Sequence, residues 1–366
     1  MKKEFLFLSI ILLFGCKNDN SIFTNHFTLN NSFEICFDEL NDINFYLYHF
    51  EEESIISFQK NNDLIALDLK TGEEVFNFHI PSNKGFLYRD HLVHNQDSIF
   101  ICSIINNDMY ILLLNNKGEI YNKWDIGSQT HSIYNGYFFI DSDYSHPMAI
   151  INDRLYFKGS YHLKPGSKIA QKVPILISLD LHNGTIKQLG DIPFEYKQGQ
   201  FYGNHQYDYS RVFNERSEMI ISFPSSHNLF VYDTSGHLIK IKNCKSKFVE
   251  NIEPINKEDK DQLAAIIDAY GYNAQYSDLV YDEYNNMYYR IVLHELEKND
   301  INNKKNDVRK RNWSIMVLDS NLNIKSEIKM PLNQFWKRIH ITEQGLLMKS
   351  SDNNANKFKI YKLCIK

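Results

Sequence analysis

The side chains that could do chemistry in this sequence are mainly histidine, arginine and tyrosine, and they gather in a few short segments. Arginine and histidine can bind an anionic group, and tyrosine rings can stack on a sugar, so these segments favour an anionic or sugar-like ligand. The candidate ligand-binding residues are Arg89, His91, His146, His205, Tyr209, Arg211, Tyr281, Arg290, Arg338 and His340.

The same residues have a structural interpretation, in which they hydrogen-bond between strands and around ordered water. No catalytic residue is assigned, because the sequence holds no GxSxG, HExxH, GxGxxG, Walker-type or EF-hand pattern. No cofactor is predicted. No metal site is predicted either, since the cysteines that follow Cys16 form no CxxC pair and no histidine spacing suggests one.

The composition is that of a chain that buries a large core. Of the 366 residues, 43% are hydrophobic and 14% are aromatic. The formal net charge is -5, whereas proteins that bind nucleic acid normally carry a basic excess. Nucleic acid is therefore excluded as an expected partner.

The N-terminus predicts export and lipid anchoring. Lys2 and Lys3 precede an uncharged run, residues 5–14, that is too short to span a bilayer and is typical of a signal peptide. Residues 13–16 resemble a bacterial lipobox, so we expect residues 1–15 to be removed and Cys16 to be lipidated. Residues 16–30 would form a tether to the membrane. The predicted location is the cell envelope, at the outer membrane, with the membrane face left open; the alternative is an ordinary signal peptide.

A repeated hairpin predicts the fold. A short apolar strand, a turn with Asp or Asn and usually Gly, and a second strand recur at residues 63–72, 109–118, 175–184, 229–236 and 315–323. Each copy follows at least one further strand-like run, so each repeat has about four strands. Four-stranded units repeated along a chain indicate a β-propeller, with the polar residues of each innermost strand lining a central channel.

Both chain ends are predicted to complete the propeller. Residues 344–350 and 357–364 give two strands of a sixth unit, and residues 33–38 give a lone strand that could join them. Because an unclosed propeller leaves strand edges open, we predict a single all-β domain over residues 31–366, a six-bladed β-propeller closed by the N- and C-terminal strands. Cys36 and Cys364 would then be neighbours, either as a disulfide or as two buried thiols.

One short helical insertion is expected at about residues 256–271. Asn256 can cap it and Gly271 can end it. Leu263, Ile266, Ile267 and Tyr270 fall on one face, which is predicted to pack on the propeller.

The sequence also resembles known propellers. The first hairpin is similar to the repeat of pyrroloquinoline-quinone-type propellers, although Phe76 stands where that repeat has Trp. The whole chain better resembles uncharacterised Bacteroidetes lipoproteins with a TolB-like six-bladed propeller, through the lipobox at Cys16, the six units and the segment at residues 281–290. This resemblance implies a fold and an envelope location, and it brings no known activity.

We therefore favour a membrane-anchored, non-enzymatic module that binds an unknown protein or glycan ligand. The alternative is a carbohydrate-active hydrolase or lyase with its site in the propeller channel.

Overall fold

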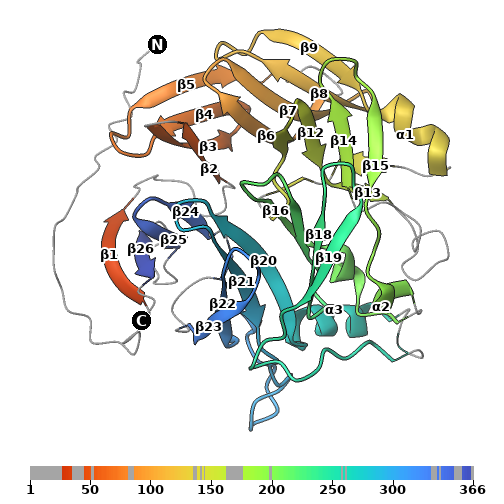
Figure 1. Cartoon of the computed structure of the whole chain (residues 1–366), viewed down its shortest axis with the longest axis vertical. Helices are drawn as coiled ribbons and strands as arrows, with labels where there is room; N and C mark the ends of the chain where they lie inside the picture. The colour runs from red at the N-terminus through yellow and green to blue at the C-terminus, as the bar shows by residue number, and fades with distance from the viewer. Residues whose placement is uncertain are drawn as a thin grey trace. The chain divides into compact units, whose positions relative to one another are not determined.

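The computed structural model describes residues 27–34, 45–50, 53–80, 86–134, 138–140, 142–143, 145–161, 176–197, 200–256, 259, 262–330, 336–337, 339–349 and 357–363. The chain has an all-β propeller fold and divides into two compact units (Figure 1). Unit 1 comprises Met1–Ile133 and Asn333–Lys366, and unit 2 comprises Tyr134–Leu332.

Unit 1 contains two antiparallel sheets that are each made from one stretch of chain. The first consists of β2 (Phe45–Phe50), β3 (Glu53–Lys60), β4 (Asp63–Asp68) and β5 (Glu74–His79). The second consists of β6 (Phe86–Asn95), β7 (Ser98–Ile105), β8 (Asp108–Leu114) and β9 (Ile120–Asp125), and helix α1 (Gly127–Tyr134) follows it. A third sheet is formed by β24 (His340–Thr342), β25 (Gly345–Lys349), β26 (Lys357–Leu363) and β1 (Phe27–Glu34).

Unit 2 contains three four-stranded antiparallel sheets. The first consists of β11 (Ala149–Ile151), β12 (Arg154–Phe157), β14 (Leu176–Asp180) and β15 (Ile186–Leu189). The second consists of β16 (Ser210–Phe213), β17 (Met219–Ser222), β18 (Asn228–Tyr232) and β19 (Leu238–Asn243). The third consists of β20 (Gln275–Asp282), β21 (Met287–Leu293), β22 (Trp313–Leu318) and β23 (Ile324–Lys329).

The smaller elements of unit 2 lie between these sheets in the chain. They are the paired strands β10 (Phe138–Ile140) and β13 (Gly159–Tyr161), helices α2 (Phe194–Lys197) and α3 (Leu263–Tyr272), and the 3₁₀ turns η2 (Asn204–Tyr207) and η3 (Val308–Lys310). No helix in the described part of the chain is long and apolar enough to cross a membrane.

The predicted count of six blades is wrong, and the described chain has five. We use blade for a four-stranded sheet whose strands come from one continuous stretch of chain, and five sheets meet this description. The sixth predicted unit is a composite sheet in the order β1-β26-β25-β24, in which the two chain ends pair from Phe27↔Leu363 to Glu34↔Lys357. Its four strands do not follow one another in the chain as they do in the other four-stranded sheets. Counting it as an equivalent repeat therefore overstated the number of blades.

The paired N-terminal strand differs in position from its prediction. It begins at Phe27, inside the segment expected to be a tether, and it includes only the first two residues of the predicted strand at 33–38. Cys16, Cys36 and Cys364 lie outside the described residues, so the predicted lipidation and the predicted disulfide stay predictions.

The repeated turns are held by carboxylates and by left-handed glycines. In the first hairpin Asp68 Oδ1 accepts the backbone N–H groups of Lys70 and Thr71, and Gly72 has φ of 73°. Such a carboxylate fixes a turn, and glycine adopts positive φ without steric cost. In the fifth hairpin the positive φ of 63° falls on Leu322, one residue before the asparagine that the sequence pattern favoured.

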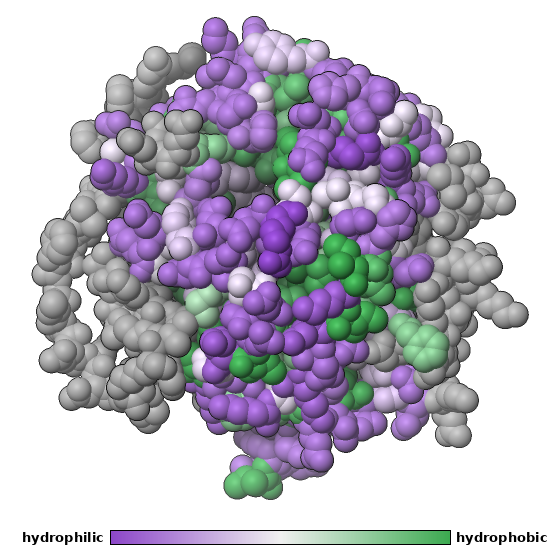
Figure 2. All heavy atoms as spheres, viewed as in Figure 1, coloured by the Kyte–Doolittle hydropathy of each residue, from purple (hydrophilic) through white to green (hydrophobic). Residues whose placement is uncertain are grey.

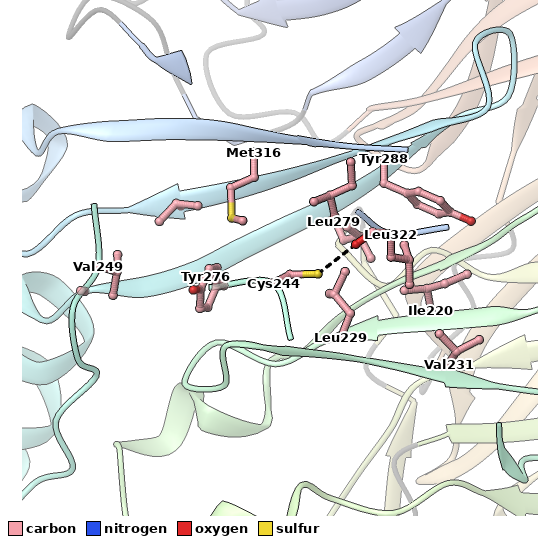
Figure 3. Close-up of a cluster of buried hydrophobic side chains, with 13 residues drawn as sticks. Ile220, Leu229, Val231, Cys244, Val249, Tyr276, Leu279, Tyr288, Met316 and Leu322 are labelled. Carbon is pink, nitrogen blue, oxygen red and sulfur yellow. Dashed lines mark hydrogen bonds between the residues drawn. The ribbon is translucent and has the colours of Figure 1, made fainter. Parts of the chain in front are cut away.

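Apolar side chains fill the space between neighbouring sheets of each unit. In unit 2, residues of β17 and β18 interdigitate with residues of β20, β21 and β22, as Figure 3 shows for Ile220, Leu229, Tyr276 and Met316. In unit 1, a similar cluster joins the sheet of β2–β5 to the sheet of β6–β9. Hydrophilic residues cover much of the face drawn in Figure 2, although some apolar residues are visible on it.

Helix α3 packs through a face that only partly matches the one predicted, because Ile266 is common to both. Leu263, Ile267 and Tyr270 are 69%, 55% and 50% exposed, respectively. The contacts with Phe201 and Ile255 come instead from Ala265, Ile266 and Ala269. The helix is apolar on both sides, and its small alanines allow a closer approach to Phe201 and Ile255. It also begins at Leu263, after Gln262, and Gly271 lies inside it.

Candidate functional site

The innermost strands of unit 2 converge through one serine. Strands β16 and β20 lie side by side, and residues 145–148 lead into β11. Ser210 Oγ lies 3.3 Å from the carbonyl oxygens of both Ser145 and Leu279, and it accepts the N–H of Leu279 at 2.9 Å. Ser210 thus joins the entry to β11 with β16 and β20, and we call the polar cluster around this junction the inner site.

Asp143 holds His146 in the inner site. Its Oδ1 lies 2.6 Å from His146 Nδ1 and accepts the backbone N–H groups of Ser145 and His146 at 2.8 and 3.1 Å. Burial alone would raise the pKa of Asp143, but His146, Lys158 and the Ser145 N–H outweigh it and lower this pKa to about 2. An ionised carboxylate at this position keeps the proton of the imidazole on Nδ1. The buried His146 Nε2 has no hydrogen-bond partner among the described residues.

Arg211 contacts the backbone next to His146 and has no carboxylate partner among the described residues. It is 2% exposed, its Nη2 donates to the carbonyl oxygen of Pro147, and its guanidinium lies 5.4 Å from the centre of the Phe213 ring. Within the described chain, its Nη1 has no acceptor and no acidic side chain forms an ion pair with it. Burial lowers the pKa of Arg211 to about 10, so the group remains charged at neutral pH.

Other side chains complete the inner site. The buried Lys158 places Nζ 3.2 Å from Asp208 Oδ1. The Tyr209 ring makes an edge contact with His146 at 5.4 Å and lies 5.9 Å from Lys158 Nζ. Asp278 accepts a hydrogen bond from the Ser145 hydroxyl at 2.8 Å. The cluster therefore combines cationic groups with a carboxylate-oriented imidazole, which suits anion binding or proton transfer.

Arg290 was predicted to face the channel but lies on β21, the second strand of its blade. Its guanidinium donates to Ser222 Oγ and to the carbonyl oxygens of Ser226, His227, Asn228 and Cys244, and it stacks 3.4 Å from the centre of the Tyr276 ring. The guanidinium is therefore hydrogen-bonded mainly to the backbone of unit 2, and we place Arg290 outside the inner site.

Two more candidates in unit 2 also lie apart from it. His205, on η2, is buried, makes an edge contact with Tyr270 at 5.3 Å, and has its pKa lowered to about 4, mainly by burial. Tyr281, on β20, packs against Tyr288 and donates a hydrogen bond to Asn286 Oδ1 at 3.3 Å.

The remaining candidates belong to unit 1. His91, on β6, hydrogen-bonds Ser57 Oγ at 2.8 Å and the Tyr88 hydroxyl at 2.5 Å, and burial lowers its pKa to about 3. Arg89 is exposed on the same strand. His340 begins β24 and its ring lies 4.7 Å from that of Phe45. Arg338 lies outside the described residues.

The structure brings the candidates His146, Tyr209 and Arg211 together in the inner site, but their partners were not predicted from the sequence. Asp143 stands three residues before His146, a spacing that lets a tight turn bring carboxylate and imidazole together. Lys158 follows three apolar residues, Leu-Tyr-Phe. Lysine is rarely buried, so a lysine at the end of a buried strand could have indicated a functional side chain. Across the described residues, no group of three His, Cys, Asp or Glu side chains is arranged to hold a metal ion.

Comparisons with known proteins identify one family and several similar structures. No curated protein matches it. A crystal structure of a DUF4221 member from Bacteroides vulgatus is similar, with a TM-score of 0.72, 18% identity and coverage of 93% of this chain and 99% of that one.

Two weaker structural similarities involve other proteins. A protein of unknown function from Bacteroides caccae gives a TM-score of 0.38 at 11% identity, with coverage of 84% and 94%. Virginiamycin B lyase from Staphylococcus aureus gives 0.40 at 12% identity, with coverage of 92% and 100%.

The sequence match is to a family, and it covers well over half of the chain, from residue 85 to residue 329. It spans both β6–β9 of unit 1 and nearly all of unit 2, including the inner site. The chain therefore belongs to the family described as a domain of unknown function, DUF4221.

Proposed function

We propose that this protein is a lipid-anchored envelope protein whose propeller binds an anionic ligand at the inner site. The observation that carries this proposal is the buried Arg211, which has a free Nη1 and no carboxylate partner among the described residues. Buried polar groups are nearly always hydrogen-bonded, and an uncompensated buried charge is costly. An anion that accepts a hydrogen bond from Nη1 would remove this cost.

The surroundings of Arg211 support the same ligand class. His146 presents a second unpartnered nitrogen one residue before the Pro147 carbonyl that Arg211 contacts. Lys158 adds a buried positive charge next to the Tyr209 ring. The site therefore offers charge and hydrogen-bonding groups to a small anion.

Binding of simple anions by the mature protein tests the proposal. Acetate and phosphate would be titrated while ligand-detected NMR measures binding to the wild type and to Arg211→Gln. We expect at least about a tenfold weaker affinity in Arg211→Gln, because a charge-assisted hydrogen bond contributes about 1.5–3 kcal/mol. Arg216→Gln is the matched control, since Arg216 is half-exposed and pairs with Glu218. Equal affinities for the wild type and Arg211→Gln would refute the proposal.

Lipid anchoring is supported by the basic start of the chain and by the lipobox-like residues 13–16. Cys16→Ser removes the thiol that would carry the lipid. In the native host we expect the wild type in the detergent phase of a phase-separation assay and Cys16→Ser in the aqueous phase. An unmodified N-terminal peptide in the mass spectrum of the wild type would contradict the anchor.

A second candidate function is a carbohydrate-active hydrolase or lyase, favoured by the contact of 2.6 Å between Asp143 and His146. A carboxylate that orients an imidazole is the arrangement of a general base. Purified protein would be incubated with acidic and neutral oligosaccharides, and new reducing ends or new double bonds measured. Turnover that His146→Ala abolishes would establish the enzyme, whereas absence of turnover with retained anion binding would favour the binding module.

A further inference from the structure

We infer that the inner site takes a hydroxycarboxylate, whose carboxylate binds Arg211 and whose neighbouring hydroxyl donates to His146. This inference rests on the proposed anion site and names the chemistry that the site selects. It is built from the hydrogen-bonding capacity that remains on these two side chains after their contacts within the protein are counted.

The first step concerns the guanidinium. One N–H of Arg211 Nη2 donates to the carbonyl oxygen of Pro147, so this nitrogen is partly used within the protein. Nη1 still carries two N–H groups without a described acceptor. It can therefore bind one end of a carboxylate and leave the rest of the ligand to be recognised by another residue.

The second step concerns the imidazole. Asp143 accepts at His146 Nδ1, so in the neutral ring Nε2 is a hydrogen-bond acceptor rather than a donor. A carboxylate without a hydroxyl has nothing to donate to Nε2. A ligand that carries a hydroxyl next to its carboxylate supplies both an acceptor for Arg211 and a donor for His146.

The third step concerns proximity and size. Arg211 Nη2 donates to the carbonyl oxygen of the residue that directly follows His146, so both side chains lie at the entry to β11. His146 and Arg211 are 3% and 2% exposed, and the Tyr209 ring packs against the imidazole. Only a small end of a ligand can be recognised there. Two sources provide such an end: a free small hydroxy acid or the terminal unit of an acidic sugar.

Matched ligand pairs test the inference on the mature full-length protein. Lactate and propionate differ only in the hydroxyl, and glucuronate and glucose compare an acidic sugar with a neutral one. We expect lactate to bind about tenfold more tightly than propionate, since one hydrogen bond to a buried group contributes about 1.4 kcal/mol. Tighter binding of glucuronate than of lactate would identify an acidic sugar as the source, and the reverse order a free hydroxy acid.

Variants assign the two contacts separately. His146→Phe keeps a ring but removes Nε2, so the preference for lactate over propionate should fall to within about twofold, one neutral hydrogen bond being lost. Arg211→Gln should weaken lactate and propionate alike. His182→Phe is the control, because His182 is exposed and lies on a turn beside Asp153. If His146→Phe does not fold, ¹⁵N-histidine NMR of the wild type replaces it, with a shift of the His146 Nε2 resonance expected for lactate and not for propionate.

The outcomes separate this inference from the proposal beneath it. Equal binding of lactate and propionate, or a lactate preference that survives in His146→Phe, overturns the hydroxycarboxylate while leaving the anion site intact. Phosphate that binds as tightly as lactate with the same dependence on His146 also overturns it, because protonated phosphate carries its own hydroxyl. If neither acid binds, or if Arg211→Gln changes nothing, the anion site itself fails.

Discussion

Replacing Arg290 with methionine removes the charged group that ties together one region of unit 2. Arg290 is fully buried, and its guanidinium donates to Ser222 Oγ and to four backbone carbonyl oxygens, at 2.7–3.4 Å. Three of these carbonyls, those of Ser226, His227 and Asn228, lie between β17 and β18 or at the start of β18, and the fourth is that of Cys244, just after β19. Methionine fills much of the volume but donates no hydrogen bond.

The expected cost follows from the carbonyls left without a donor. A hydrogen bond from a charged donor contributes about 1.5–3 kcal/mol, but the arginine also loses its own hydration on burial, and this loss offsets part of the gain. Leaving a buried acceptor without its donor costs about 1–3 kcal/mol, and methionine leaves several carbonyl oxygens without this donor. Because several acceptors lose the same donor, we expect the free energy of unfolding to fall by about 3–5 kcal/mol, and the melting midpoint by about 6–10 °C at about 2 °C per kcal/mol.

Calorimetry and urea denaturation of the mature protein measure this effect. Arg216→Met is the control, because the partly exposed pair of Arg216 and Glu218 should contribute less than about 1 kcal/mol. Arg290→Lys keeps the charge on a single nitrogen that cannot reach all of these acceptors, so we expect an intermediate loss. A melting midpoint of Arg290→Met within about 2 °C of the wild type corresponds to a loss of about 1 kcal/mol or less. That result would refute the structural role of Arg290.

Three further predictions concern pH, a turn and a helix. Burial lowers the pKa of His91 to about 3 and that of His205 to about 4, so below pH 6.5 the unfolded chain binds protons that the folded chain does not. The free energy of unfolding should therefore fall as the pH drops to 4.5, and equal urea midpoints at pH 7 and 4.5 would contradict this. Gly236 has φ of 87°, and a Cβ there would lie 2.8 Å from β15, so Gly236→Ala should lower the free energy of unfolding measured in urea by about 1–3 kcal/mol. On α3, Ile267→Ser should change thermal stability by less than about 0.5 kcal/mol, whereas Ala269→Phe should cost about 1–3 kcal/mol, and similar losses for both would argue against the observed helix face.

The hairpins could be predicted from the sequence because they are local. An aspartate such as Asp68 and a glycine such as Gly72 fix a turn through contacts within a few residues, and alternating apolar runs give the strands on either side. The number of blades depends instead on how distant chain ends pair. The strand at 33–38 looked sufficient to extend the repeat, but pairing of Phe27–Glu34 with Lys357–Leu363 is non-local and produces a composite sheet.

The face of α3 could not be predicted for a related reason. Leu263 and Ile267 are larger and more apolar than Ala265 and Ala269, so burial of the larger side chains was the natural expectation. Close packing against Phe201 favoured the small residues instead.

The candidate site was only partly predictable, because sequence position does not reveal what a buried arginine contacts. Arg211 and Arg290 both stand in apolar strands, yet one retains an open nitrogen and the other is engaged by backbone carbonyls. The role of Asp143 likewise depends on a turn that brings its carboxylate to His146.

A crystal structure of the mature protein grown with lactate tests the central claim most directly. The account predicts a carboxylate oxygen within about 3 Å of Arg211 Nη1 and a hydroxyl within the same distance of His146 Nε2. It would be contradicted by lactate bound only elsewhere, or by Arg211 Nη1 and His146 Nε2 both hydrogen-bonded to side chains of the protein itself.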